Sequence, residues 1–105
     1  MAWLYLITAG VLEVIWAYSM KQSGGFSRLI PSIITVLTMI ASFGLLAAAM
    51  RVLPLGTSYS IWTGIGAVGA FLVGVFFLGE SFNALRVIAA LLIISGLVLM
   101  KFSGE

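Results

Sequence analysis

The sequence predicts an all-α integral membrane protein with four transmembrane helices, forming a single domain over residues 1–105. Of these residues, 63% are hydrophobic and 8% are charged, and the mean hydropathy is +1.28. A soluble chain of this length cannot bury so much apolar surface. The apolar residues also fall into four runs, each close to the ~20 residues that cross a bilayer. Helices are expected rather than strands, because backbone groups in lipid must be satisfied within the segment.

The first two predicted helices cover approximately residues 2–20 and 31–50. The first ends at the sequence KQSGGFSRLIP, where two glycines, two cations and a proline interrupt the hydrophobic run. Pro31 opens the second run and is suited to the first turn of a helix. The second run stops at RVLPLG, so a short turn is expected before the third.

The third and fourth predicted helices cover approximately residues 57–78 and 84–102. The third contains no charged residue and ends at GES, where Gly79 fits the position just beyond a helix end. Ser81 or Asn83 is expected to cap the fourth helix. The four segments occupy most of the chain, and the connections are too short to form a second domain.

The charged residues in the connections give little preference for one membrane orientation. Arg51 and Lys101 lie on the side of the termini, and Lys21, Arg28 and Arg86 lie on the other. The count is two cations against three, and the N-terminal amine adds a positive charge to the side that has two. The positive-inside rule therefore does not predict an orientation. Two outcomes stay open. The chain could insert both ways and pair antiparallel, or lipids and the insertion machinery could fix one orientation.

Small residues on the last two predicted helices are suited to close helix contacts. Gly66, Ala70 and Gly74 form a stripe at four-residue spacing, and Ala89 and Gly96 lie on the fourth helix. A four-helix chain is small for a path across the membrane, and a second copy would supply further walls. The stripe fits contacts within one chain or between two, and the sequence does not distinguish them.

Glu13 is the one acidic residue deep within a predicted span. An ionised group at this depth costs a few kcal/mol, and intramembrane ionisable residues commonly mark ion or substrate paths. Glu80 and Glu105 lie in a loop and at the terminus, and no cation lies within a span as an obvious partner. The alternative is a structural carboxyl that is protonated and hydrogen-bonded to a neighbouring helix.

A single buried carboxyl group can hold a proton or a cation, but not comfortably both. Burial disfavours its charged form, whereas a bound cation favours it. This competition is the minimum device for exchanging protons against cations, and two copies of Glu13 in one cavity would titrate as a coupled pair. An enzyme is not expected, because Glu13 has no evident acid–base or nucleophilic partner.

The composition excludes several other classes of site. The chain has no Cys and no His, so disulfides, thiolate chemistry and the common zinc and iron sites are not expected. The net charge of +2 is small and scattered, so nucleic-acid binding is not expected. No cofactor is predicted, and the proton is the expected coupling ion.

Polar and aromatic side chains on three predicted helices are candidates to surround Glu13. Trp16 lies one turn beyond Glu13 on the same helical face. Ser42 on the second helix offers a hydroxyl, and Tyr59 and Trp62 on the third offer ring faces and an indole N–H. For the aromatic residues, the alternative is a membrane-interface belt or a packing role. The predicted cation site consists of Gly10, Glu13, Trp16, Ser42, Tyr59 and Trp62.

Three segments of the sequence carry a resemblance to a known family. The segments GVLEVIWAYSMKQSGGFSRLIPS, ASFGLLAAAMRVLPLGTSYSIWTGIGAVGA and FFLGES resemble the small multidrug resistance family, over essentially the whole chain. The resemblance implies an antiparallel dual-topology homodimer in the bacterial inner membrane that exports cations by proton-coupled alternating access. The essential glutamate of the family falls on Glu13, and its hydrogen-bonding and aromatic residues fall on Trp16, Ser42, Tyr59 and Trp62.

Within that family, the chain looks like the branch that exports guanidinium rather than bulky hydrophobic cations. Guanidinium is planar, and its N–H groups match a carboxylate bidentately. A large Trp16 beside the carboxylate would narrow the space for bulky drugs. Ser58 and Ser60 depart from the branch, where alanines are common, and this leaves the breadth of substrates open. The residues similar to the guanidinium branch are Gly10, Trp16, Ala17, Met39, the run WTGIGAVGA from Trp62, and Lys101.

Three hypotheses therefore remain. The first is a proton-coupled guanidinium exporter, in which Glu13 alternates between proton and substrate. The second is a broader exporter of hydrophobic or quaternary ammonium cations. The third is a non-transporting membrane scaffold or one subunit of an obligate heterodimer, although the balanced charges argue against a heterodimer.

Overall fold

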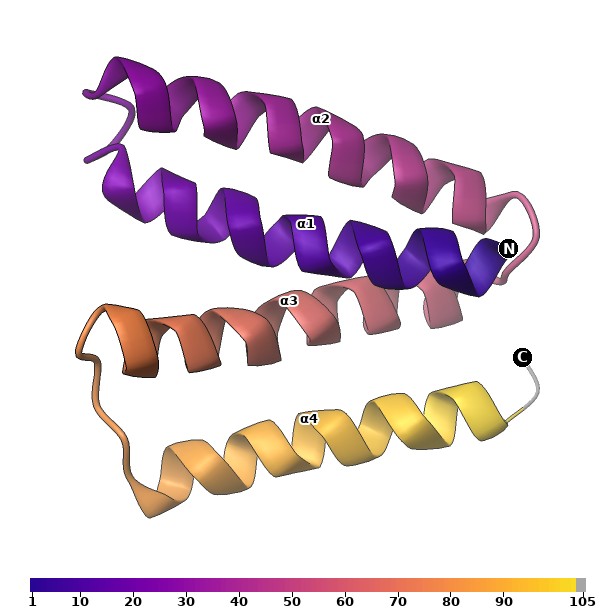
Figure 1. Ribbon diagram of the computed structural model, residues 1–105. Coiled ribbons are helices and arrows are strands. Elements are labelled where there is room, and N and C mark those ends of the chain that lie inside the picture. The colour runs from indigo at the N-terminus through magenta and orange to yellow at the C-terminus, as the bar shows by residue number, and fades with distance from the viewer. Residues whose placement is uncertain (104–105) are drawn as a thin grey trace.

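The computed structural model describes residues 1–103 and places four helices within them (Figure 1). Each helix is long and apolar enough to cross a membrane, which confirms the prediction of four membrane-spanning helices. Their bounds are α1, Ala2–Gln22; α2, Leu29–Met50; α3, Leu55–Phe77; and α4, Ala84–Phe102.

The observed helix starts differ from the predicted ones by two residues at α2 and α3. α2 begins at Leu29, so Pro31 lies in its first turn, where the missing N–H would have had no helical partner. α3 begins at Leu55 because Pro54 is its N-cap, and the Pro54 carbonyl accepts the Ser58 N–H at 3.0 Å. Pro54 thus directly precedes α3, and Pro31 is the third residue of α2.

The connection from α3 to α4 follows the predicted local rules. Gly79 has a φ of +67°, which suits glycine just beyond a helix end, and the Glu80 N–H donates to the Gly74 carbonyl at 3.0 Å. At the start of α4, the Asn83 side chain accepts the Arg86 backbone N–H at 3.0 Å. Asn83 is therefore the cap, of the two candidates that the sequence offered.

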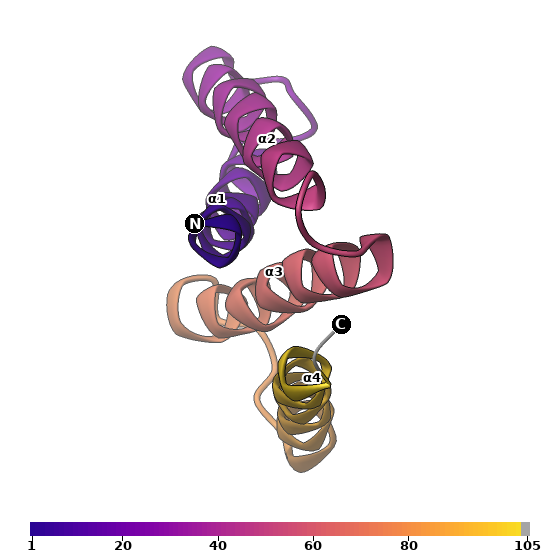
Figure 2. The ribbon, with the colours of Figure 1, turned by 90° about the vertical axis from the view of Figure 1, so that its right-hand side faces the viewer.

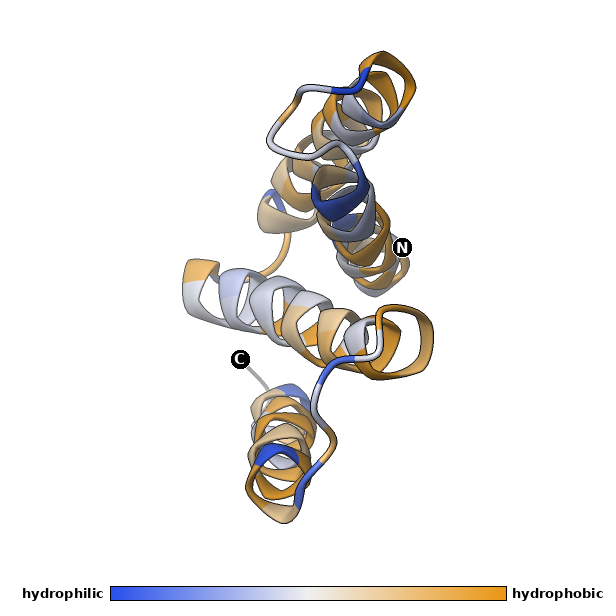
Figure 3. Cartoon of the chain, turned by 90° about the vertical axis from the view of Figure 1, so that its left-hand side faces the viewer, coloured by the Kyte–Doolittle hydropathy of each residue, from blue (hydrophilic) through white to orange (hydrophobic). Residues whose placement is uncertain are grey.

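The helices form a flat arrangement in which α1, α2 and α3 pack together, while α4 packs along α3 and reaches α1 through Lys101, which lies over the Trp3 ring (Figure 2). The described chain measures 42 × 34 × 16 Å along its principal axes. Within residues 1–103, the buried apolar side chains all lie on the first three helices, and none of the residues of α4 is buried. α4 is hydrophobic around most of its circumference (Figure 3). The core residues are Leu6, Ala9, Leu46, Ala49, Ile61 and Trp62.

The small-residue stripe of α3 makes contacts within the chain. A methyl group at Gly66 would overlap the Glu13 side chain, and one at Gly74 would overlap that of Glu80. By contrast, a methyl group at Gly96 on α4 would meet nothing within 4 Å. The sequence left open which contacts the stripe serves, and in the structure Gly66 and Gly74 give room to two carboxylates of the same chain.

Candidate functional site

The Glu13 carboxylate lies where α1 crosses α3, about halfway along both helices. The side chain is half-buried and rests on Gly66, where any Cβ would occupy its position. Its Oε1 atom is buried and has no hydrogen-bond partner within residues 1–103. A buried carboxylate oxygen without a donor is costly. The carboxylate is thus placed at a point where a proton or a cation would be stabilising.

Glycines on both helices bring α1 and α3 close together at this level. A Cβ at Gly10 would come within 2.7 Å of Ile65 Cγ2, and a Cβ at Gly69 would overlap the Val14 side chain. Large residues on one helix therefore fill the space that glycines leave on the other. Gly10, predicted as a site residue, serves this packing and does not present a polar group to the site.

A buried hydrogen-bond chain joins the first three helices beside Glu13. Trp62 donates its indole N–H to Ser42 Oγ at 3.0 Å, and Ser42 donates its hydroxyl to the Ala9 carbonyl at 2.7 Å. Ser42 is fully buried and Trp62 is 8% exposed. Ala9 precedes Glu13 by one turn, so its carbonyl is also the helical acceptor for the Glu13 N–H. Ser42 and Trp62 therefore brace the backbone that carries Glu13.

The aromatic side chains near the site form a continuous row across the same three helices. Trp16 lies edge-on to Phe43 with 6.4 Å between ring centroids, and Phe43 lies 5.7 Å from Trp62. Tyr59 continues the row, 5.8 Å from Trp62. These separations fall in the range of favourable aromatic pairs. The Trp16 indole N–H is buried and has no acceptor within the described residues, so it is available to a carboxylate or a ligand.

The structure brings the predicted site residues together to different degrees. Ser42 and Trp62 are in direct contact, and Trp16 and Tyr59 connect to Trp62 through ring contacts. Tyr59 is 53% exposed and marks the open edge of the row. A single chain therefore leaves the aromatic side of the site uncovered.

Sequence reasoning did not assign Phe43 or Gly66 to the site. Phe43 directly follows Ser42, so its place in the row could have been suspected only if the rotation of α2 were known. Gly66 belongs to the small-residue stripe predicted on the third helix. The signal for its second role, which is to leave room for a carboxylate, was the presence of Glu13 on another predicted helix.

Residues 1–103 contain no group of three His, Cys, Asp or Glu side chains that could hold a metal ion. The chemical capacity of the site thus rests on one carboxylate, two indole N–H groups, the hydroxyls of Ser42 and Tyr59, and the faces of four rings. A carboxylate binds cations, and ring faces attract them. The arrangement suits a small organic cation or a proton.

Comparison with known proteins agrees with this geometry. The family described as "Small Multidrug Resistance protein" matches residues 1–94. A guanidinium exporter of Escherichia coli (strain K12) is 53% identical over 103 residues, which cover 98% of each chain. Guanidinium exporters of Salmonella typhimurium and Yersinia pseudotuberculosis are 52% identical over 105 residues and 53% identical over 104 residues. These alignments cover all of both chains for the Salmonella protein, and 99% of this chain and 100% of the Yersinia protein.

The family match extends over nearly the full length of the chain, and the relatives align along the whole of it. These relatives are named as exporters and not as enzymes. Four membrane-spanning helices accompany the match. The chain belongs to the small multidrug resistance family and is a multi-pass transporter of the bacterial inner membrane.

Proposed function

We propose that the protein is a proton-coupled antiporter that exports guanidinium across the inner membrane by alternating access. The observation that carries the proposal is the Glu13 carboxylate, which rests on Gly66 in mid-span with a buried oxygen that no described residue hydrogen-bonds. The names of relatives about half identical in sequence support guanidinium as the cation.

In this proposal, proton and substrate compete for Glu13. An ionised carboxylate accepts two N–H groups from one edge of guanidinium, and the charge-assisted pair is stronger than a neutral hydrogen bond. Protonation removes the negative charge, so the cation leaves and the carboxyl group stays neutral in the membrane. Because one carboxylate serves both ligands, binding of a proton from one side of the membrane drives release of guanidinium to that side. The proton is then carried to the opposite side.

The neighbours of Glu13 have separate roles in the proposal. The Ser42 hydroxyl already donates to the Ala9 carbonyl and accepts the Trp62 indole N–H. Its remaining lone pair can accept an N–H from guanidinium. The Trp16 indole N–H can donate to the carboxylate and hold it in place. Trp16 and Tyr59 offer ring faces to the cation. Gly10 allows the close helix approach that sets the distance between these groups.

We further propose that the working unit is an antiparallel dual-topology homodimer. The aromatic edge of the site at Tyr59 is open in one chain, and none of the residues of α4 is buried. A second copy would cover this edge and bring a second Glu13 to the same cavity. The nearly balanced charges of the connections permit insertion in both orientations.

The experiment is transport by the purified chain in proteoliposomes, comparing wild type with Glu13→Gln. We expect uphill guanidinium transport by wild type and none by Glu13→Gln, which keeps the size of the side chain but cannot exchange a proton. Competition by tetramethylammonium or larger cations would assign the protein to the broader class of exporters. Absence of transport by wild type would reject the proposal in favour of a scaffold or a heterodimer subunit.

A further inference from the structure

A second carboxylate lies against α3, two turns beyond Gly66, where the Glu13 carboxylate lies. The Glu80 carboxylate rests on Gly74 as the Glu13 carboxylate rests on Gly66. Eight residues separate these two glycines on one face of α3, a rise of about 12 Å along the helix. Glu80 comes from the connection to α4, so its position in the chain gave no sign that it lies on the same face as the membrane glutamate.

A cavity of about 160 Å³ lies between α1 and α3, lined by Glu80 and by Val14, the residue that follows Glu13. Its inner wall includes Ala17, one turn beyond Glu13 on α1, and Ala70, one turn beyond Gly66 on α3. Glu80 and Lys21 lie at its outer end. The cavity therefore leads from the neighbourhood of Glu13 to the ends of α1 and α3, and its walls combine these two alanines with the larger side chains of Val14, Tyr18, Val73 and Leu78.

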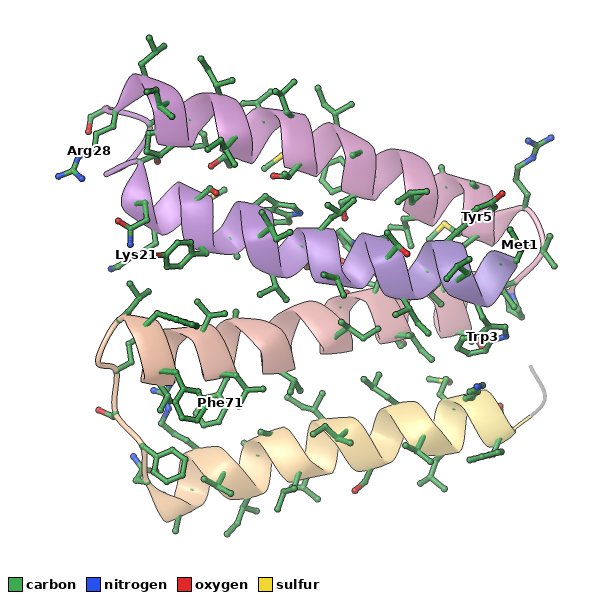
Figure 4. The ribbon with its side chains drawn as sticks, in the orientation of Figure 1. Met1, Trp3, Tyr5, Lys21, Arg28 and Phe71 are labelled. Carbon is green, nitrogen blue, oxygen red and sulfur yellow. The ribbon has the colours of Figure 1, made fainter. Side chains whose placement is uncertain are left out.

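Glu80 already faces a guanidinium group. Arg86 Nη2 lies 3.9 Å from Glu80 Oε1, and both side chains are 42% exposed. The same guanidinium lies over the Phe71 ring, 5.2 Å from its centroid (Figure 4). An exposed pair at this distance is weak, so a free guanidinium ion can replace Arg86 while the ring retains the arginine side chain.

The electrostatics of the helix ends favour a cation at this place over an unpaired carboxylate. Glu80 lies beside the last turn of α3, and α1 also ends here with Lys21 in its last turn. The carbonyl groups of a helix C-terminus carry partial negative charge, which repels a carboxylate and attracts a cation. Glu80 beside the last turn of α3 therefore favours a cation next to it, which Arg86 supplies at 3.9 Å and a bound guanidinium ion would supply in its place.

We infer that Glu80 forms an outer subsite for guanidinyl cations at the mouth of the cavity between α1 and α3, from which the cation passes to Glu13. This inference rests on the proposed function for the identity of the cation. The charged groups at the mouth are Glu80, Lys21 and Arg86, so Glu80 attracts the substrate and Lys21 opposes it.

Initial rates of guanidinium transport in proteoliposomes give two effects of opposite sign. We expect Glu80→Gln to raise KM roughly 2- to 5-fold, the range for a half-exposed charge pair, without changing the maximal rate. Lys21→Gln should lower KM by a similar factor. A role of Glu80 in helix stability alone predicts no such opposition and would alter the amount of folded protein instead.

Arg28 provides the matched control for Lys21. Both lie on the same side of the membrane by the course of the helices, but Arg28 does not line the cavity and points away from the helices in Figure 4. Arg28→Gln should leave KM unchanged. Equal effects of Lys21→Gln and Arg28→Gln, or an unchanged KM in Glu80→Gln, would overturn the outer subsite.

Binding without transport separates this inference from the proposed function. In the Glu13→Gln protein, guanidinium chloride should still shift the amide NMR signals of Gly74 and Gly79, and added Glu80→Gln should remove the shift. Shifts that persist in the double variant, or that are absent in Glu13→Gln alone, would overturn the subsite only. Absence of guanidinium transport by wild type, with these shifts intact, would reject the proposed function and leave the subsite standing.

Discussion

The unit formed by α1, α2 and α3 differs from α4 in packing far more than in composition. All four helices are apolar enough to span a membrane, yet every buried residue of a helix lies on the first three. Those three also carry Glu13, the Ser42 hydrogen bonds and the aromatic row. Hydropathy thus identifies which segments cross the bilayer, and polar and small residues determine which of them pack around a site.

α4 packs on α3 through Leu97, which lies against Gly64, and makes a cation–ring contact near each of its ends. Arg86 lies over the Phe71 ring of α3, and Lys101 lies over the Trp3 ring of α1 at 5.3 Å. Between these ends, α4 presents exposed leucine and isoleucine side chains and the open surface at Gly96. The apolar side chains that α4 leaves exposed are the surface that a second copy would cover in the proposed homodimer.

The largest loss of transport should come from filling the space at Gly66 that the Glu13 carboxylate occupies. Gly66→Val would place a branched side chain where the carboxylate lies, and overpacking at such a position costs ~1–3 kcal/mol. We expect guanidinium transport to fall at least about tenfold. Gly44→Val on α2 is the control, because nothing lies within 4 Å of a Cβ there. Equal losses of transport in both variants would show that the space at Gly66 has no special role.

Removal of the Ser42 hydroxyl should have the next largest effect. Ser42→Ala leaves the buried Trp62 indole N–H without its acceptor, which costs ~1–3 kcal/mol. Thermal denaturation in detergent should show the loss of stability, and transport should fall with it. Ser95→Ala is the counterpart on α4, where the exposed hydroxyl bonds only the Leu91 carbonyl of its own helix. A similar loss in Ser95→Ala would remove the distinction between the two regions.

Replacement of Phe43 should change selectivity more than stability. Phe43 lies between Trp16 and Trp62 and is 47% exposed, so Phe43→Ala would open the row without exposing the buried core. We expect larger alkylated guanidinium ions to compete better with guanidinium, measured as the ratio of their inhibition constants. An unchanged ratio would exclude Phe43 as a wall of the site.

The smallest effect should follow loss of the contact between α4 and α1. Lys101→Gln removes the cation over Trp3, an exposed interaction of about 0.5–1 kcal/mol. Hydrogen exchange should become faster at the C-terminal end of α4 and stay unchanged in α2. Arg51→Gln, which removes a cation on the same side of the membrane, is the control. Faster exchange throughout the chain in Lys101→Gln would contradict a local restraint.

Local sequence signals predicted the helices and their caps well, because these depend on neighbours along the chain. Pro31, Gly79 and Asn83 took the positions that backbone geometry and hydrogen bonding require. The contacts of Gly66 and Glu80 were not predictable in this way. They depend on the rotation and register of α1 against α3, which an almost uniformly apolar sequence does not specify.

The candidate site was predictable in its chemistry but not in its full composition. A carboxylate in mid-span is rare enough to be recognised from one sequence. Helical spacing related Trp16 to it, and the family resemblance indicated Ser42, Tyr59 and Trp62. Phe43 resembled any other lipid-facing residue, since only the tertiary arrangement places it between two tryptophan rings. The bond from Ser42 to the Ala9 carbonyl also involves a backbone atom, which no residue pattern identifies.

Proton movement driven by a guanidinium gradient is the most direct test of the central claim, that one carboxylate exchanges both ions. Proteoliposomes loaded with a pH-sensitive dye would be exposed to an outward guanidinium gradient at zero membrane potential. Wild type should acidify the lumen as guanidinium leaves, and Glu13→Gln should show no proton movement above that of protein-free liposomes. Acidification by Glu13→Gln at the rate of wild type would contradict the account.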